Sequence, residues 1–111
     1  MSVNFNNETL SNEVVAIVKQ LRNARPGGKV KAFGEDIPVQ MFSAKGSPVQ
    51  GTLPAVVMYG TVTKEVEGEP KLFKSQLVVV KSTIAKQGNA YFAKLDGKAI
   101  GLVKQGKFIP A

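Results

Sequence analysis

The spacing of apolar residues changes at Pro26-Gly27-Gly28, and this change limits the folds that the chain can adopt. Before this point apolar residues recur every three or four positions, which is typical of an amphipathic helix. After it they alternate, and turn residues separate short runs, as in an antiparallel sheet. We therefore predict an α+β fold, mainly antiparallel β, with an N-terminal helix packed on a small barrel or strongly bent sheet. An OB-like barrel is one form that such a fold can take.

The predicted helix lies within residues 8–24, between short polar residues that can cap its first turn and the Pro-Gly-Gly stop. Its apolar side chains form one stripe, which needs cover. The stripe should pack on the β body or pair with a second copy of the chain. The residues available for such a homo-oligomer contact are Leu10, Val14, Ile17 and Leu21.

Residues 29–109 should form the antiparallel β body, and the chain is short enough for residues 1–111 to be a single domain. Ala55–Tyr59 and Leu77–Val80 are apolar on both faces, so their strands should be central and covered on each side. Glu65–Pro70 should be a long hairpin tip between them. The expected strands are Lys29–Phe33, Pro38–Ser43, Leu53–Lys64, Lys71–Lys81, Asn89–Leu95 and Lys98–Lys104.

Asp96-Gly97 is the strongest turn signal, because a two-residue hairpin turn needs positive φ at both central positions. Counting outward from this turn predicts which residues face each other across the hairpin. Phe92 and Lys94 should lie together on the less apolar face, opposite the core. The expected pairs are Leu95 with Lys98, Lys94 with Ala99, Ala93 with Ile100, Phe92 with Gly101, and Tyr91 with Leu102.

The net charge of +7 belongs entirely to the last 41 residues. Residues 1–70 contain seven basic and seven acidic residues, whereas residues 71–111 contain eight lysines and only Asp96. Such an asymmetry favours an anionic partner such as nucleic acid or anionic lipid. A simpler alternative is that the charge only keeps the protein in solution.

An exposed aromatic ring beside lysines on a flat strand is a surface on which single-stranded bases can stack. The leading hypothesis is therefore a non-enzymatic protein that binds nucleic acid, DNA or RNA and single-stranded, through a lysine-rich β face. Phe92 would be the stacking ring, unless it packs beneath other side chains. The candidate binding residues are Lys71, Lys74, Lys81, Lys86, Phe92, Lys94, Lys98, Lys104 and Lys107.

The string Ser43-Ala44-Lys45-Gly46-Ser47-Pro48 resembles one near an early hairpin in the small single-stranded DNA-binding proteins of filamentous phages. Lys86-Gln87-Gly88-Asn89-Ala90-Tyr91 is loosely similar to the same string. The resemblance covers six residues. It implies an OB-type barrel that coats single strands cooperatively as a dimer.

Catalytic chemistry has little support in the composition. The chain has no histidine and no cysteine, which excludes His-based triads, thiol chemistry and zinc fingers, and we expect no enzyme activity, cofactor or metal. Glu65, Glu67 and Glu69 lack further oxygen ligands for a cation. No signal peptide or membrane span is predicted, so we expect a cytoplasmic protein. If the protein is viral, we expect it in the cytoplasm of the host or in the virion.

The main alternative is a protein-interaction or assembly component, such as a small structural or inhibitory protein of viral or phage type. Its contact would be the helix stripe or an exposed strand edge. Lysines on an edge discourage strand addition, so the helix is the favoured contact. The helix does not resemble a membrane anchor, because its polar face mixes charges and its stripe has no tryptophan or phenylalanine.

Overall fold

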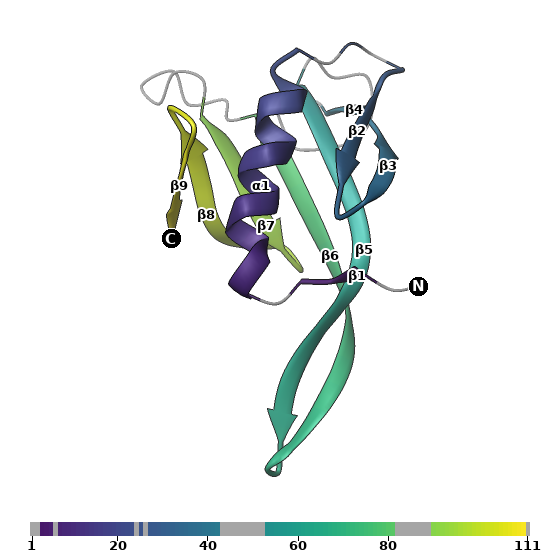
Figure 1. Ribbon diagram of the computed structural model, residues 1–111, viewed down its shortest axis with the longest axis vertical. Helices are drawn as coiled ribbons and strands as arrows, with labels where there is room; N and C mark the ends of the chain where they lie inside the picture. Colours follow the sequence, from purple (N-terminus) through teal and green to yellow (C-terminus); the bar gives the residue numbers. More distant parts are fainter. Residues whose placement is uncertain are drawn as a thin grey trace.

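The computed structural model of the chain describes residues 3–5, 7–23, 25, 27–42, 53–81 and 90–110. In this part of the chain one helix, α1 (Asn7–Leu21), lies against a large sheet and a separate hairpin (Figure 1). The strands are β1 (Val3–Asn4), β2 (Lys29–Ala32), β3 (Glu35–Pro38), β4 (Gln40–Phe42), β5 (Leu53–Val66), β6 (Glu69–Lys81), β7 (Tyr91–Leu95), β8 (Lys98–Lys104) and β9 (Lys107–Pro110).

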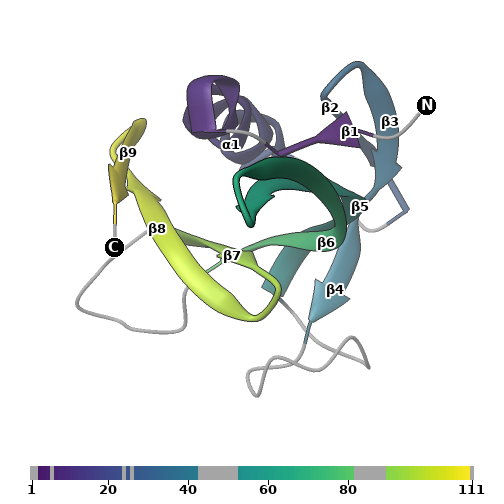
Figure 2. The same ribbon diagram turned by 90° about the horizontal axis from the view of Figure 1, so that it is seen from below.

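The large sheet has the strand order β1-β5-β6-β7-β8-β9, with β4 also paired to β5. All of its pairings are antiparallel except that of β1 with β5. The sheet bends around α1, and its two end strands do not pair, so no barrel closes (Figure 2). The predicted α+β fold with a helix on a strongly bent sheet is confirmed, and the closed barrel is not formed.

The helix stripe is buried inside the molecule. Its side chains share one apolar core with Met58, Leu77 and Val79 from the two central strands. Of the two alternatives for covering the stripe, packing on the β body is the one found, which leaves Leu10, Val14, Ile17 and Leu21 unavailable to a second copy in the folded chain. The helix ends at Leu21, three residues before the predicted limit, and Gly27 follows with a φ of 83°.

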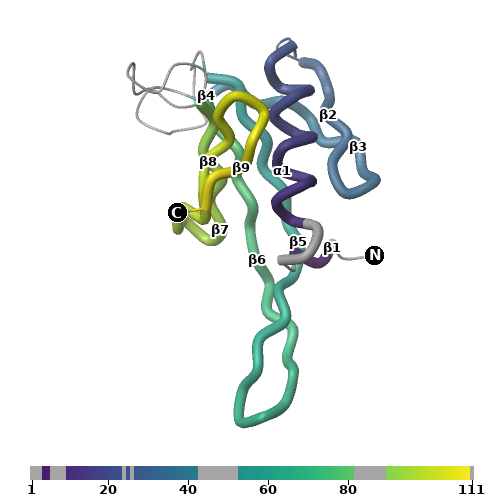
Figure 3. The backbone as a smooth tube through the Cα atoms, turned by 60° about the vertical axis from the view of Figure 1, so that its left-hand side comes forward, coloured from purple at the N-terminus to yellow at the C-terminus, as the bar shows by residue number. Residues whose placement is uncertain are grey.

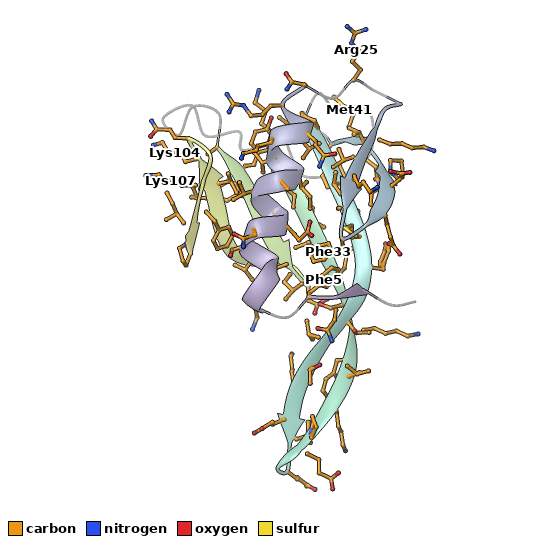
Figure 4. All side chains as sticks on the ribbon, viewed as in Figure 1. Phe5, Arg25, Phe33, Met41, Lys104 and Lys107 are labelled. Carbon is orange, nitrogen blue, oxygen red and sulfur yellow. The ribbon has the colours of Figure 1, made fainter. Side chains whose placement is uncertain are left out.

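The β2–β3 hairpin is attached to the helix by polar side chains. The Gln20 side-chain amide accepts from the Lys31 backbone N–H at 2.7 Å and donates to the Lys31 carbonyl at 2.8 Å. The Phe33 N–H donates to the Glu13 carboxylate, and the Phe33 ring meets Phe5 edge to face with centroids 5.4 Å apart (Figure 4). These contacts hold the hairpin on the same side of the sheet as the helix.

Four two-residue turns connect the hairpins, and each has positive φ at both central positions. Asp96-Gly97 is the predicted one; the others are Phe33-Gly34, Glu67-Gly68 and Gln105-Gly106. The prediction of a long tip over Glu65–Pro70 is therefore wrong, because β5 and β6 continue in register to Val66 and Glu69. Glycine at the second position accepts positive φ without steric cost, which permits the tight turn.

Two strand predictions need correction. The segment predicted as one strand, Pro38–Ser43, is divided at Val39 because β3 folds back on β2 whereas β4 pairs with β5. Strands β1 and β9 were not predicted; β1 pairs with β5, and β9 pairs with β8 through the Gln105-Gly106 turn. Ser43 and Asn89, the ends of two predicted strands, lie outside the described residues.

The β7–β8 register agrees with the prediction for the two pairs next to the turn, Leu95 with Lys98 and Lys94 with Ala99. Beyond them the register shifts by one residue, so Ala93 faces Gly101, and the three remaining predicted pairs are wrong. The cause is a β-bulge in which Ile100 has no partner and packs against the core.

Strands β5 and β6 are central, as predicted, and their far ends leave the body as a two-stranded arm (Figure 3). We use "arm" for residues 63–72, which form the turn-containing end of this hairpin. Leu72 on the arm is 66% exposed, and Phe73 at its base is 41% exposed. The Lys64 ammonium lies 5.7 Å from the centre of the Phe73 ring.

Candidate functional site

The sheet has one face turned away from α1, which we call the outer face. Strict alternation along β5, β6 and β7 places on it Ala55, Val57, Tyr59, Gln76, Val78, Val80, Phe92 and Lys94. Among the described elements, α1 and the β2–β3 hairpin pack on the opposite face (Figure 2). The outer face is apolar at one end, where Phe42, Ala55 and Val80 form a second small core cluster.

Tyr59 is the most exposed large hydrophobic side chain of the outer face, at 74%. It faces Gln76 across the central strands, and the Gln76 side-chain amide donates to the Tyr59 hydroxyl at 3.2 Å. This hydrogen bond ties the ring edge to the sheet while the ring face stays accessible. An exposed, oriented ring of this kind can stack on a planar ligand.

Two shallow grooves meet at Tyr59 and Gln76. One, of about 350 Å³, contains Lys94 with Phe42 and Val78 among its walls. The other, of about 540 Å³, contains Lys74 and lies toward the base of the arm. Tyr59 therefore stands between two lysines along a continuous track on the outer face.

Phe92 lies on the outer face, as the alternation predicted, but it is only half-exposed. It packs against the second core cluster and faces Val80 across β6 and β7. Val57 and Val78 are half-buried in the same cluster. The central strands were predicted to be covered on both faces. Their helix side is fully covered, whereas their outer face is covered only in part.

Asp96 is the one acidic residue among the described walls of the two grooves. Its carboxylate accepts from the Ser75 hydroxyl at 2.7 Å and from the Gln76 backbone N–H at 2.9 Å. The hydrogen bond from Ser75, followed by that from Gln76 and by the positive charge of Lys64, lowers the pKa of Asp96. These bonds fasten the β7–β8 turn to β6 next to Tyr59.

The lowered pKa of Asp96 makes a prediction about acid stability. Because the folded-state pKa lies below the unfolded value of about 3.9, the stabilisation is present above that value and is lost as the pH falls through the folded pKa. Asp96→Asn keeps a residue suited to the turn but cannot ionise. We expect the wild type to lose more stability than Asp96→Asn between about pH 6 and pH 2, measured by urea denaturation. Parallel pH profiles for the two proteins would contradict this assignment.

Of the predicted lysines that lie in the described residues, the structure brings two to Tyr59, namely Lys74 and Lys94. Lys71 lies on the arm opposite Lys64, and Lys98 follows the β7–β8 turn. Lys104 and Lys107 face each other beside the β8–β9 turn at the edge of the sheet (Figure 4). Lys81 lines a separate pocket with Arg22, and Lys86 lies outside the described residues.

Sequence reasoning missed Tyr59, because it stands in a run that is apolar on both faces. A signal was available in the alternate positions Ala55, Val57, Tyr59, Thr61 and Thr63, which change from apolar to polar along one face. A strand face that changes in this way is leaving the core. Tyr59 stands at the change and is therefore the aromatic residue most exposed by it.

Within the described residues there is no group of three or more acidic, histidine or cysteine side chains that could hold a metal ion. No helix in this part of the chain is long and apolar enough to cross a membrane. The two strings that resemble phage single-stranded DNA-binding proteins lie outside the described residues, except for Ala90 and Tyr91.

Comparison with protein-family models, with curated proteins and with solved structures finds no match to this chain. Its function therefore has to be inferred from its own residues.

Proposed function

We propose that the protein binds single-stranded nucleic acid along the outer face and performs no catalysis. The observation that carries the proposal is the position of Tyr59, an exposed ring between Lys74 and Lys94 in two connected grooves. A base stacked on Tyr59 would place its flanking phosphates near these lysines. The overall charge of +7 would add long-range attraction for a polyanion.

The grooves favour a single strand over a duplex. They are shallow and lie on a sheet, whereas the described part of the chain presents no helix that could enter a major groove, because α1 is packed into the core by its apolar stripe. Apolar walls such as Val57 and Val78 suit the faces of unpaired bases. Stacking is tolerant of sequence, so we expect little base specificity.

Tyr59→Ala should weaken binding of a labelled single-stranded oligonucleotide by about 1–3 kcal/mol, because it removes the stacking surface. Tyr59→Phe keeps the ring and should bind within about twofold of the wild type.

Lys94→Gln should reduce the magnitude of the slope of log affinity against log salt by about 0.7, the value for one phosphate contact on a single strand. Fluorescence anisotropy at several salt concentrations measures all three.

Lys98→Gln is the matched control for Lys94→Gln. It removes the same charge from the same hairpin, but Lys98 lines neither groove. It should change affinity less than Lys94→Gln does. The proposal fails if the wild type shows no salt-sensitive binding at low salt, or if Tyr59→Ala binds as tightly as the wild type.

Assembly of the chain with itself or with another protein is the second candidate. It is favoured by Leu72 and Phe73, whose apolar side chains are exposed on and beside the arm. Exposed apolar groups on a projecting hairpin are typical of a contact surface. Sedimentation of the protein without nucleic acid tests self-assembly, since binding of a single strand does not require a large particle under those conditions.

A further inference from the structure

A polar pocket, separate from the two grooves at Tyr59, lies on the helix side of the sheet. Its volume is about 550 Å³, and its described walls are Lys19, Arg22, Asn23, Lys81 and Tyr91. Lys19 and Arg22 lie three residues apart around the C-terminal end of α1, and Lys81 pairs directly with Tyr91 across β6 and β7. Docking of the helix on the sheet therefore creates the pocket.

The walls of the pocket carry three cations and no described carboxylate. The carbonyl end of a helix offsets part of the charge of Lys19 and Arg22, which is a sufficient structural reason for those two residues. It does not account for Lys81, which comes from the sheet. Three like charges around one open pocket repel each other, and an anion bound between them would relieve that repulsion.

Tyr91 provides a second, independent observation. Its side chain is only 3% exposed, and it has no hydrogen-bond partner among the described residues. Every completely buried side-chain oxygen or nitrogen of the described residues has a hydrogen-bond partner. The Tyr91 hydroxyl has no such partner, so it is not completely buried and reaches solvent at the wall of the pocket. Burial raises the pKa of Tyr91, and Arg22 lowers it to a smaller extent. At neutral pH the hydroxyl is a donor held in a nearly buried position.

We propose that this pocket binds a phosphate group. Arg22 can donate two parallel hydrogen bonds to phosphate oxygens, and Lys19 and Lys81 can each supply a point charge. The Tyr91 hydroxyl and the Asn23 amide can donate to the remaining oxygens. Phosphate matches this set because it offers several acceptor oxygens and up to two negative charges. Its source is either a free phosphate compound or the terminal phosphate of a nucleic-acid strand.

Tyr59→Phe makes a direct test available, because the chain has two tyrosines and no tryptophan. In this background all tyrosine fluorescence comes from Tyr91. Titration with inorganic phosphate at constant ionic strength, balanced with chloride, should give a saturable change in that fluorescence. Arg22→Gln and Lys81→Gln, made in the same background, should each raise the dissociation constant about tenfold or more.

Arg25→Gln is the matched control, since Arg25 points away from the body and does not line the pocket (Figure 4). It should leave phosphate binding unchanged. Absence of a saturable signal, or equal effects of Arg22→Gln and Arg25→Gln, would overturn the proposal.

Two oligonucleotides of one sequence, with and without a 5′-phosphate, identify the source of the group. Tighter binding of the phosphorylated strand, lost in Arg22→Gln, assigns the pocket to a strand terminus. Equal binding of the two strands, with inorganic phosphate still saturating, assigns it to a free phosphate compound. Neither result depends on Tyr59 stacking, so failure of the outer-face proposal would not remove the phosphate signal.

Discussion

Ile17→Ala will lower the free energy of unfolding by about 2–5 kcal/mol. Ile17 is 0% exposed and is one of the largest side chains that are completely buried. It belongs to the core shared by α1 and the central strands. Its truncation removes apolar contact and leaves a cavity that the rigid sheet cannot fill. Since domains of this size have a total stability of about 5–15 kcal/mol, the loss is a large fraction of the whole.

Ile17→Val is the graded control, because it removes one methylene from the same site and should cost about 0.5–1.5 kcal/mol. Urea denaturation followed by circular dichroism measures both variants at one pH. A cost below about 1 kcal/mol for Ile17→Ala would mean that the stripe is not packed on the sheet in solution. In that event the helix would again be available to a second copy of the chain.

Gly101→Ala will destabilise the protein by about 1–3 kcal/mol, although it adds only one methyl group. A Cβ at this position would lie 2.5 Å from Cζ of Phe108 and 2.7 Å from the carbonyl oxygen of Ile109. The ring could move, but the carbonyl belongs to strand β9, which pairs with β8 at this point. The substitution therefore displaces β9 and, with it, the packing of Phe108 on the core.

Ala99→Val tests whether bulk alone is responsible, because Ala99 is an exposed residue of the same strand. It should change stability by less than about 0.5 kcal/mol. A double-mutant cycle with Phe108→Ala adds a sharper test, since removal of the ring should reduce the cost of Gly101→Ala. A Gly101→Ala protein as stable as the wild type would show that β9 does not pack as described.

Ile17 and Gly101 stabilise different parts of the fold. Ile17 holds α1, which carries Lys19 in its last turn and is followed directly by Arg22, so the proposed phosphate pocket depends on that packing. Gly101 permits the β8–β9 pairing at the far edge of the sheet. Neither residue lines the grooves at Tyr59, so neither variant tests stacking directly.

Local signals in the sequence predicted the class of every long element. The helix stripe, the continuous apolar runs of the two central strands and the Asp96-Gly97 turn each depend on residues close together in the chain, and each is present in the structure. The turns at Phe33-Gly34 and Gln105-Gly106 were harder to predict, because their first residues are not those that favour positive φ. Tertiary contacts supply the reason at Phe33, whose ring packs on Phe5.

Two features of the candidate sites were beyond sequence reasoning. The bulge at Ile100 changed the β7–β8 register because packing of that side chain on the core outweighs regular pairing. The lysines of residues 71–111 were expected on one face. Those that lie in the described residues are distributed over the arm, the outer face, the helix side and the sheet edge, because strand order and turns place each one separately.

The sequence by itself determined the helix, the longer strands and the excess of positive charge, because periodicity, turn chemistry and composition are local properties. Only the tertiary structure decided where the charged side chains lie. Bending of the sheet around α1 leaves Tyr59 exposed between Lys74 and Lys94, and docking of the helix brings Arg22 to Lys81 and Tyr91. These residues are far apart in the chain, and only the packing of the shared core places them together.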